Sequence, residues 1–342
     1  MAQGFAKTTR CQLAIVMCSL LGSSSALAQG CVIARGGASS AYQSNDSLLE
    51  EGHWQVGVAY RWFRSHRHFI GHVEETQREG DGTEVVNREH FLDLNLTYAA
   101  TNRLWLNLTV PYLAADRSSL YEHDRVHRYH TQSTGLADVR LVTTWWLQDP
   151  RTATHGNWSI GLGIKAPTGD YENTDTFIRP SGPARRYVDS SIQPGDGGWG
   201  AIVETQGFLP LTGSWSGYFN GSYLINPAER NRTTNFSVPD SHLARLGVDY
   251  AMSSAPGLTL SLGGRVEGVP PQDLIGGNGG SRRPGYAISL EPGLQYSNTH
   301  WSAGLSVPIA MDRSRQRTYR AATVGDAAFA DYSINLNISR RY

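Results

Sequence analysis

The sequence predicts an all-β fold, a transmembrane antiparallel up-and-down β-barrel of about 12 strands that follows a cleaved signal peptide. Three observations favour this fold. Apolar and polar residues alternate over segments of about ten residues, the links between segments are alternately short and long, and the chain begins with a secretion signal. The periodicity of amphipathic helices is absent, and glycines gather between the alternating segments.

The first 28 residues have the organisation of a secretory signal peptide. Lys7 and Arg10 precede an apolar run over 13–21, and a segment of small residues ends at Ala28. This apolar run is too short to span a bilayer as a helix. We therefore expect cleavage after Ala28.

Cleavage there removes Cys11 and Cys18 and leaves Cys31 as the last cysteine. The mature chain is then expected to contain no intrachain disulfide. Cys31 lies three residues after Ala28, where lipidated N-termini also begin, so a lipoprotein is the alternative interpretation.

Residues 29–52 are small and polar and do not alternate, so we expect an irregular periplasmic leader. Its roughly 20 residues would extend about 60–70 Å, enough to thread and plug a barrel lumen. The barrel is predicted over 53–342. Its predicted strands are approximately 53–63, 88–99, 103–115, 135–148, 156–167, 198–210, 213–225, 241–253, 257–268, 285–296, 299–310 and 328–342.

The clearest alternation runs from His90 to Leu113, on both sides of a turn at 101–103. Its apolar positions are Leu92, Leu94, Leu96, Tyr98, Leu104, Leu106, Leu108, Val110 and Tyr112. Because side chains alternate faces along a strand, each strand has one apolar and one polar face. Such strands cross a bilayer when tilted, although a soluble sandwich would show the same alternation.

The links between the segments decide between these folds. Short links lie near Thr101, 150–155, Leu211, Pro256 and Asn298, and long polar links of roughly 12–30 residues lie at 64–87, 116–134, 168–197, 226–240, 269–284 and 311–327. Short turns at one rim and long loops at the other are typical of bacterial outer-membrane barrels, whose short turns face the periplasm. No later run of 18 apolar residues exists, so a closed barrel is the expected route into the membrane.

Prolines and aromatic residues predict the two rims. Proline cannot donate a ladder hydrogen bond and belongs at strand ends or bulges. We expect the extracellular rim near Pro111, Pro167, Pro227, Pro270 and Pro308, whereas Pro292 falls inside a segment and does not fit. Two aromatic girdles are predicted, one from Trp54, Tyr98, Trp158, Trp215, Tyr250, Tyr296, Trp301 and Tyr342 near the short turns, and one from Trp62, Tyr112, Trp199, Tyr223 and Tyr286.

Charged residues on the polar face are predicted to line the pore. They are Arg61, Asp93, Asp138, Arg140, Lys165, Glu204, Arg245, Asp249, Arg265, Glu267 and Glu291. Both signs are present, so no strong ion selectivity is expected. A network of ion pairs that fills a narrow barrel is the alternative to a solute path, because about 12 strands lie between filled barrels and open porins.

Composition and motifs argue against several other functions. The signal peptide holds two of the 30 basic residues and none of the 30 acidic ones, so the mature chain has no basic excess for nucleic acid. Haem-attachment, phosphate-loop and paired-carboxylate motifs are absent, so we expect no enzyme and no cofactor. Histidines gather as His66, His68 and His72 and as His123, His127 and His130, a pattern that metal ions use but that a solvated loop explains better.

A lipid-modifying enzyme is the third hypothesis, because Asn298, His300 and Ser302 lie close together in the sequence. The parity of Trp301 directs His300 and Ser302 towards the lumen, whereas such an enzyme presents its nucleophile to lipid. The longest loop, 168–197, carries mixed charges that are expected to pair with Arg140, Lys165 or Glu204 and to constrict the pore, or else to stay outside it.

Three motifs carry a family resemblance: Gly135-Leu-Ala-Asp-Val-Arg-Leu141, Gly161-Leu-Gly-Ile-Lys-Ala-Pro-Thr-Gly-Asp170 and Gln193-Pro-Gly-Asp-Gly-Gly-Trp-Gly200. Over about 135–210 the chain resembles bacterial outer-membrane proteins that are labelled as components of a meta-pathway of phenol degradation or as transporters. The resemblance implies a barrel and uptake of aromatic or other small hydrophobic compounds.

We therefore predict a passive pore in the cell outer membrane, with a closed structural or binding barrel as the alternative. The expected partners are outer-membrane lipids, a small-molecule solute and the barrel assembly machinery, which would recognise the last strand ending at Tyr342.

Overall fold

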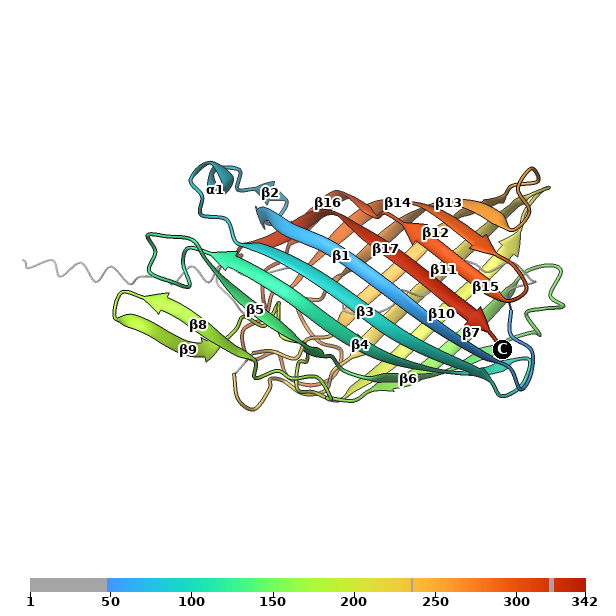
Figure 1. Cartoon of the computed structure of the whole chain (residues 1–342), viewed down its shortest axis with the longest axis horizontal. Coiled ribbons are helices and arrows are strands. Elements are labelled where there is room, and N and C mark those ends of the chain that lie inside the picture. The colour runs from blue at the N-terminus through green and yellow to red at the C-terminus, as the bar shows by residue number, and fades with distance from the viewer. Residues whose placement is uncertain (1–47, 235, 320–322) are drawn as a thin grey trace, which may run out of the picture.

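The computed structural model describes residues 48–234, 236–319 and 323–342, and these form one barrel of tilted strands (Figure 1). In this part of the chain the helix α1 (Gln77–Gly80) is a single turn. No helix of the described residues has the length and apolar character needed to cross a membrane.

The strands follow the chain in order. They are β1 (Trp54–Ile70), β2 (Val73–Glu74), β3 (Val86–Ala99), β4 (Leu104–Ser119), β5 (Tyr129–Leu136), β6 (Arg140–Trp146), β7 (Asn157–Lys165), β8 (Thr174–Arg179), β9 (Gly182–Tyr187), β10 (Gly200–Pro210), β11 (Trp215–Ile225), β12 (Ser241–Ala251), β13 (Leu258–Val269), β14 (Gly285–Ser297), β15 (Trp301–Ser306), β16 (Ile309–Arg315) and β17 (Ala327–Arg341).

Antiparallel pairing of successive strands closes the sheet on itself. The last strand, β17, pairs with β1 from Gln55 opposite Arg341 to Phe69 opposite Ala327. Because β5 and β6 both pair with β4, and β15 and β16 both pair with β14, each of these couples is one interrupted barrel strand. Counted in this way the barrel has 12 strands, which confirms the predicted fold.

Apolar side chains cover the outside of the barrel. Leu94 is 49% exposed on the exterior, whereas the next residue, Asn95, accepts a hydrogen bond from the Thr109 hydroxyl at 2.8 Å on the inner face. Other exposed apolar residues include Val58, Leu106, Leu141, Ile160, Leu162, Leu246, Leu260, Leu290 and Leu336. Paired aromatic rings such as Trp54 with Tyr98 and Trp215 with Tyr250 lie at the short-turn rim. This exterior belongs to a barrel that spans the outer membrane, not to a soluble sandwich.

Two glycines make room for a large ring on the inner wall. A Cβ atom at Gly263 would lie 2.3 Å from the Tyr218 hydroxyl, and one at Gly247 would lie 2.6 Å from it. The Tyr218 ring from β11 therefore extends over β12 and β13, and its side chain is buried. Glycine in these strands reflects a close approach and not a turn.

Several strands continue past the predicted ends on the long-loop side. β1 extends to Ile70 and β4 to Ser119, where the apolar face has already ended. The predicted extracellular position of Pro111 and Pro308 is wrong, because each lies within a barrel strand. Pro111 faces the interruption between β5 and β6, and Pro308 is the interruption between β15 and β16, so neither proline removes a ladder bond from a continuous pair.

The remaining proline positions follow the same principle. Pro167, Pro227 and Pro270 come just after β7, β11 and β13. Pro292 lies inside β14, and its carbonyl accepts a hydrogen bond from the Val307 N–H at 3.0 Å, next to the interruption in the neighbouring strand. Its place is thus explained by the break in β15–β16.

The longest loop contains a β-hairpin that stands away from the barrel (Figure 1). Its strands, β8 and β9, form a separate two-stranded sheet. The hairpin docks on the neighbouring loop through Phe177, whose ring stacks on His123 at 5.2 Å between centroids. The signal peptide and leader residues 29–47 lie outside the described residues, so the predictions for them stay predictions.

Candidate solute path through the lumen

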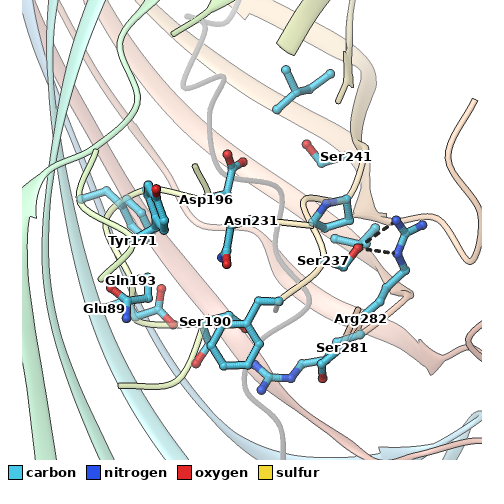
Figure 2. A pocket seen from close by; sticks show the side chains of 18 of the residues that line it. Glu89, Tyr171, Ser190, Gln193, Asp196, Asn231, Ser237, Ser241, Ser281 and Arg282 are labelled. Carbon is cyan, nitrogen blue, oxygen red and sulfur yellow. Dashed lines mark hydrogen bonds between the residues drawn. The ribbon is translucent and has the colours of Figure 1, made fainter. Parts of the chain in front are cut away.

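Three cavities lie inside the barrel. The outer cavity, near the long loops, measures about 130 Å³ and has aromatic walls from Phe63, Phe91, Tyr171 and Phe236 (Figure 2). The middle cavity measures about 50 Å³, and the inner cavity, towards the short turns, about 200 Å³.

The three cavities adjoin one another. Phe91, Asp196 and Leu224 line both the outer and the middle cavity. Asp93 and Arg140, together with Ala59, line both the middle and the inner cavity. The shared residues place the three cavities next to one another along the lumen, and the middle cavity has the smallest volume of the three.

Six of the predicted pore residues lie along these chambers. Arg61, Asp93, Asp138, Arg140 and Lys165 line the middle cavity, and Glu204 lines the inner one with Asp93 and Arg140. The Lys165 ammonium group is 3.5 Å from the Asp138 carboxylate and also forms an ion pair with Asp196 from the long loop. Their part in solute passage stays a prediction.

The other five predicted residues line none of these three cavities. Arg245 and Glu291 form an ion pair at 2.7 Å, and Arg265 and Glu267 form another at 3.0 Å, all four side chains being buried. The fifth, Asp249, is also buried, and neither of its carboxylate oxygens has a hydrogen-bond partner among the described residues. The interior therefore combines an ion-pair network along β12–β14 with chambers lined mainly by the opposite strands.

Loops close over the outer cavity at the long-loop rim. Asp189 joins two of them, since its carboxylate pairs with Arg283 and lies 3.8 Å from the Arg117 guanidinium. Burial alone would raise the pKa of Asp189, but the two guanidinium groups outweigh burial and hold this pKa well below its usual range. The buried Arg282 pairs with Asp273 and donates to the Ser237 hydroxyl (Figure 2). We call these ion-paired loops the roof.

No pattern in the sequence predicts the roof. Its pairs join residues far apart in the chain, such as Asp189 and Arg283, and single charges in polar loops carry no pattern that identifies a partner. The neighbouring arginines at 282 and 283 were the one available signal.

The long loop behaves only partly as expected. Asp196 at its end pairs with Lys165, as the mixed charges suggested. Residues at its base, including Ser190 and Gln193, line the outer cavity (Figure 2). The hairpin β8–β9 at its centre lies outside the lumen (Figure 1), so the tip of this loop follows the alternative in which the loop stays outside the pore.

The histidine groups do not form metal sites among the described residues. His68, Glu75 and Asp326 lie close enough together to hold an ion. However, Nδ1 of His68 is 2.7 Å from the Asp326 carboxylate, and its Nε2 accepts the Val85 N–H at 2.8 Å. Arg78 pairs with both Glu75 and Asp326, so both carboxylates already have a cationic partner.

The other histidines have separate partners. His66, His72, His127 and His130 each lie near a different carboxylate, on Asp331, Asp312, Asp124 and Asp116 respectively. His123 accepts the Ile178 N–H at Nδ1, at 3.1 Å. Neither sequence group of three converges on one point.

The residues considered for lipid chemistry form a turn. The Asn298 carboxamide oxygen accepts the N–H groups of His300 and Trp301. The Ser302 hydroxyl is buried and shares a 2.6 Å hydrogen bond with Ser339. Ser302 faces the barrel interior, as the position of Trp301 in the alternation predicted. Its hydroxyl bonds to another serine.

Comparison with known proteins shows the fold. No protein-family model matches the chain, and no curated protein matches its sequence. The barrel is similar to a crystal structure of the COG4313 outer membrane channel from Pseudomonas putida F1, with a TM-score of 0.58 and 14% identity over 89% of this chain and 100% of that chain. Two other barrels are less similar. The β domain of the Bordetella autotransporter Brka has a TM-score of 0.45 and 13% identity over 85% of this chain and 100% of that chain. The P. putida toluene transporter TodX has a TM-score of 0.41 and 12% identity over 86% of this chain and 90% of that chain.

Proposed function

We propose that this protein is a passive outer-membrane channel for small solutes, and that small aromatic or other hydrophobic compounds are the class it conducts. The observation that carries the proposal is the path of three adjoining chambers inside a barrel that spans the membrane. Asp93 and Arg140 lie where the middle chamber meets the inner one, so their charges face every solute that passes.

The outer cavity supports the aromatic class. Its volume, about 130 Å³, is close to that of the roughly 150 Å³ apolar cavity known to hold benzene. The rings of Phe63 and Phe91, stacked at 6.0 Å, line this cavity. Serine hydroxyls and the Arg282 guanidinium offer polar contacts to its contents (Figure 2). A planar ring with a hydroxyl substituent fits this combination, in agreement with the resemblance to the phenol-degradation label.

The middle cavity supports neutral solutes over ions. Arg61, Arg140 and Lys165 face Asp93 and Asp138 in a space of about 50 Å³. An ion of either sign meets like charges there as well as opposite ones, and it also loses its hydration. An uncharged solute avoids both costs, and the passage of a ring requires the charged side chains to move apart, because this space is smaller than a cavity that holds benzene.

Single-channel current through the purified barrel in a planar bilayer tests the proposal. The parent protein should conduct, and a phenolic solute at millimolar concentration should interrupt the current. Phe91→Ala should weaken this block about tenfold, whereas Leu94→Ala on the exterior should leave it unchanged. A parent that conducts without aromatic block would reject the solute class alone.

Two other functions are distinguished by the same current measurement and by a lipid assay of the purified barrel in proteoliposomes. A structural or binding barrel with a closed lumen would carry no current in the parent or in any lumen variant. A lipid-modifying enzyme would release lipid products in the proteoliposomes and lose this activity in His300→Ala. We propose outer-membrane lipids as the partner of the apolar exterior, and no enzymatic step is part of the proposed function.

A further inference from the structure

Two arginines face each other on the outside of the barrel, near the long loops. Arg64 on β1 and Arg88 on the adjacent strand β3 are direct partners in the antiparallel register (Figure 1), which puts their Cβ atoms about 5 Å apart. Their sequence neighbours Phe63 and Glu89 line the outer cavity. Because side chains alternate faces along a strand, both arginine side chains are directed to the exterior. Like charges at directly opposite positions repel each other, so an anion between them would be stabilising.

The protein supplies little counter-charge at this pair. Among the described residues Arg64 forms no ion pair, and its buried Nε has no hydrogen-bond partner. Arg88 lies 3.3 Å from the Asp116 carboxylate, but Nδ1 of His130 lies 2.9 Å from the same carboxylate. The side chains of Arg88 and His130 are 47% and 51% exposed. An anion in the surrounding medium can therefore reach this face.

The next carboxylate along the rim has other partners. Asp331 lies 2.8 Å from the guanidinium of Arg67 and 2.8 Å from that of Arg313. Arg67 also pairs with Glu74. Two arginines and two carboxylates balance one another there, which leaves no excess negative charge for Arg64.

Aromatic residues place the arginine pair at the level of lipid headgroups. Trp62 and His90 lie one outward position nearer the membrane on the same two strands and are also direct partners. The Trp62 ring is 5.9 Å from the Tyr332 ring, and the Tyr60 hydroxyl is 2.7 Å from Nδ1 of His90. Tryptophan and tyrosine gather where acyl chains meet headgroups. The arginines, about 7 Å further along each strand, lie where lipids carry their phosphate groups.

We infer that Arg64 and Arg88 bind a phosphate group of lipid A, the phosphorylated glycolipid of the outer leaflet. A guanidinium is a planar fork of donors that matches phosphate oxygens, and two of them lie side by side here. Below them Leu92 and its strand partner Tyr112 are 46% and 41% exposed and offer an apolar surface to the acyl chains. The inference rests on the outer-membrane lipids proposed above as partners of the exterior and on the predicted outward orientation of the long loops. It does not depend on the solute path.

Titration of the purified, detergent-solubilised protein with lipid A, followed by native mass spectrometry, tests the site. Replacement of both residues, Arg64→Gln with Arg88→Gln, should weaken binding about tenfold. Arg340→Gln removes an exterior arginine at the short-turn rim and should leave the affinity unchanged. Asp116→Asn frees Arg88 and His130 from their carboxylate and should tighten binding several-fold, an effect that general destabilisation does not produce.

Equal affinities of the parent and the double glutamine variant, both folded by heat modifiability, would overturn the site. Equally tight binding of lipid A without its phosphates would do the same, because only acyl contacts would then be at work. Phosphatidylglycerol that binds as tightly as lipid A would overturn the assignment to lipid A.

If the double variant does not fold, Arg64→Gln alone applies the same test with a smaller expected loss. Lipid A binding by a parent that carries no current would keep the site and reject the proposed channel. Current through a parent that does not bind lipid A would reject the site alone. The failure of either proposal is therefore seen separately.

Discussion

The Arg61 guanidinium on β1 lies 2.9 Å from the Glu267 carboxylate on β13, although three barrel strands separate these two around the wall. Arg265 shares the same carboxylate at 3.0 Å. The pair thus spans part of the barrel interior, and Arg61 at one end of it lines the middle cavity. Two guanidinium groups therefore share one buried carboxylate.

Loss of that carboxylate should destabilise the barrel strongly. Glu267→Gln removes the carboxylate that the buried Arg61 and Arg265 share, and breaking a buried pair of this kind costs about 3–5 kcal/mol. The control Glu74→Gln breaks a partly exposed pair with Arg67 and should cost about 0–1 kcal/mol. Urea unfolding followed by tryptophan fluorescence measures both, and similar midpoints for the two variants would contradict the bridging role.

The two faces of β3 should respond differently to a charge. Leu94→Arg places a guanidinium against lipid near the middle of the membrane and should cost about 2–4 kcal/mol of folding free energy. Asn95→Arg, one residue further, points into the lumen and should be tolerated. The fraction of heat-modifiable barrel in the outer membrane reports this difference, and equal losses would show that the faces are assigned wrongly.

Docking of the β8–β9 hairpin should weaken in mild acid. Burial lowers the pKa of His123 from its ordinary value of 6.5, so the docked hairpin prefers the neutral ring. The undocked state then binds more protons, and docking stability is complete above about pH 6.5 and falls as the pH drops from there towards the lowered pKa. Protonation at Nδ1 also removes the acceptor of the Ile178 N–H.

Hydrogen exchange at the Ile178 amide, corrected for intrinsic rates, measures this effect between pH 5 and 8. Protection should decrease below about pH 6.5 in the parent. His123→Phe, which keeps the stacking on Phe177 but cannot titrate, should show no such decrease. The same pH dependence in both proteins would exclude His123 as its origin.

The last strand should be needed for assembly. Tyr342 ends the chain directly after β17, with its ring exposed on the outside next to Arg340, whose guanidinium carbon lies 4.8 Å from the ring centroid. We predict that the barrel assembly machinery recognises this end, so deletion of Tyr342 should reduce insertion several-fold. Tyr332→Ala, in the same strand but away from its end, is the control. Normal amounts of inserted barrel after the deletion would argue against this signal.

Alternation in the sequence was sufficient to predict the 12 barrel strands, because one face of each strand meets lipid. Leu94 and Asn95 illustrate how a single step in the sequence separates lipid from lumen. The same signal fails at the long-loop ends, where β1 over 64–68 and β4 over 116–119 carry polar residues on both faces. The alternation also predicted that the charged residues face the barrel interior, but it carries no information on which of these residues form ion pairs.

The site depended on contacts that have no local pattern. Arg61 meets Glu267 across the lumen, and Asp189 meets Arg283 in the roof, because closure of the barrel brings distant segments together. Leu48 and Leu49 are two apolar residues in a polar leader, too few to produce a periodicity. Their side chains are buried in a cluster with Trp105 and Trp146.

Reversible block of single-channel current by a thiol reagent tests the central claim that solutes pass through the lumen. In a Cys31→Ser background, Val142→Cys lies on the wall of the inner cavity and Leu141→Cys, its neighbour, lies on the lipid face. A methanethiosulfonate reagent should reduce the current through the Val142→Cys channel by more than half, and a reductant should restore it. The Leu141→Cys channel should keep its full current. Equal currents before and after modification of Val142→Cys would contradict a path through the inner cavity.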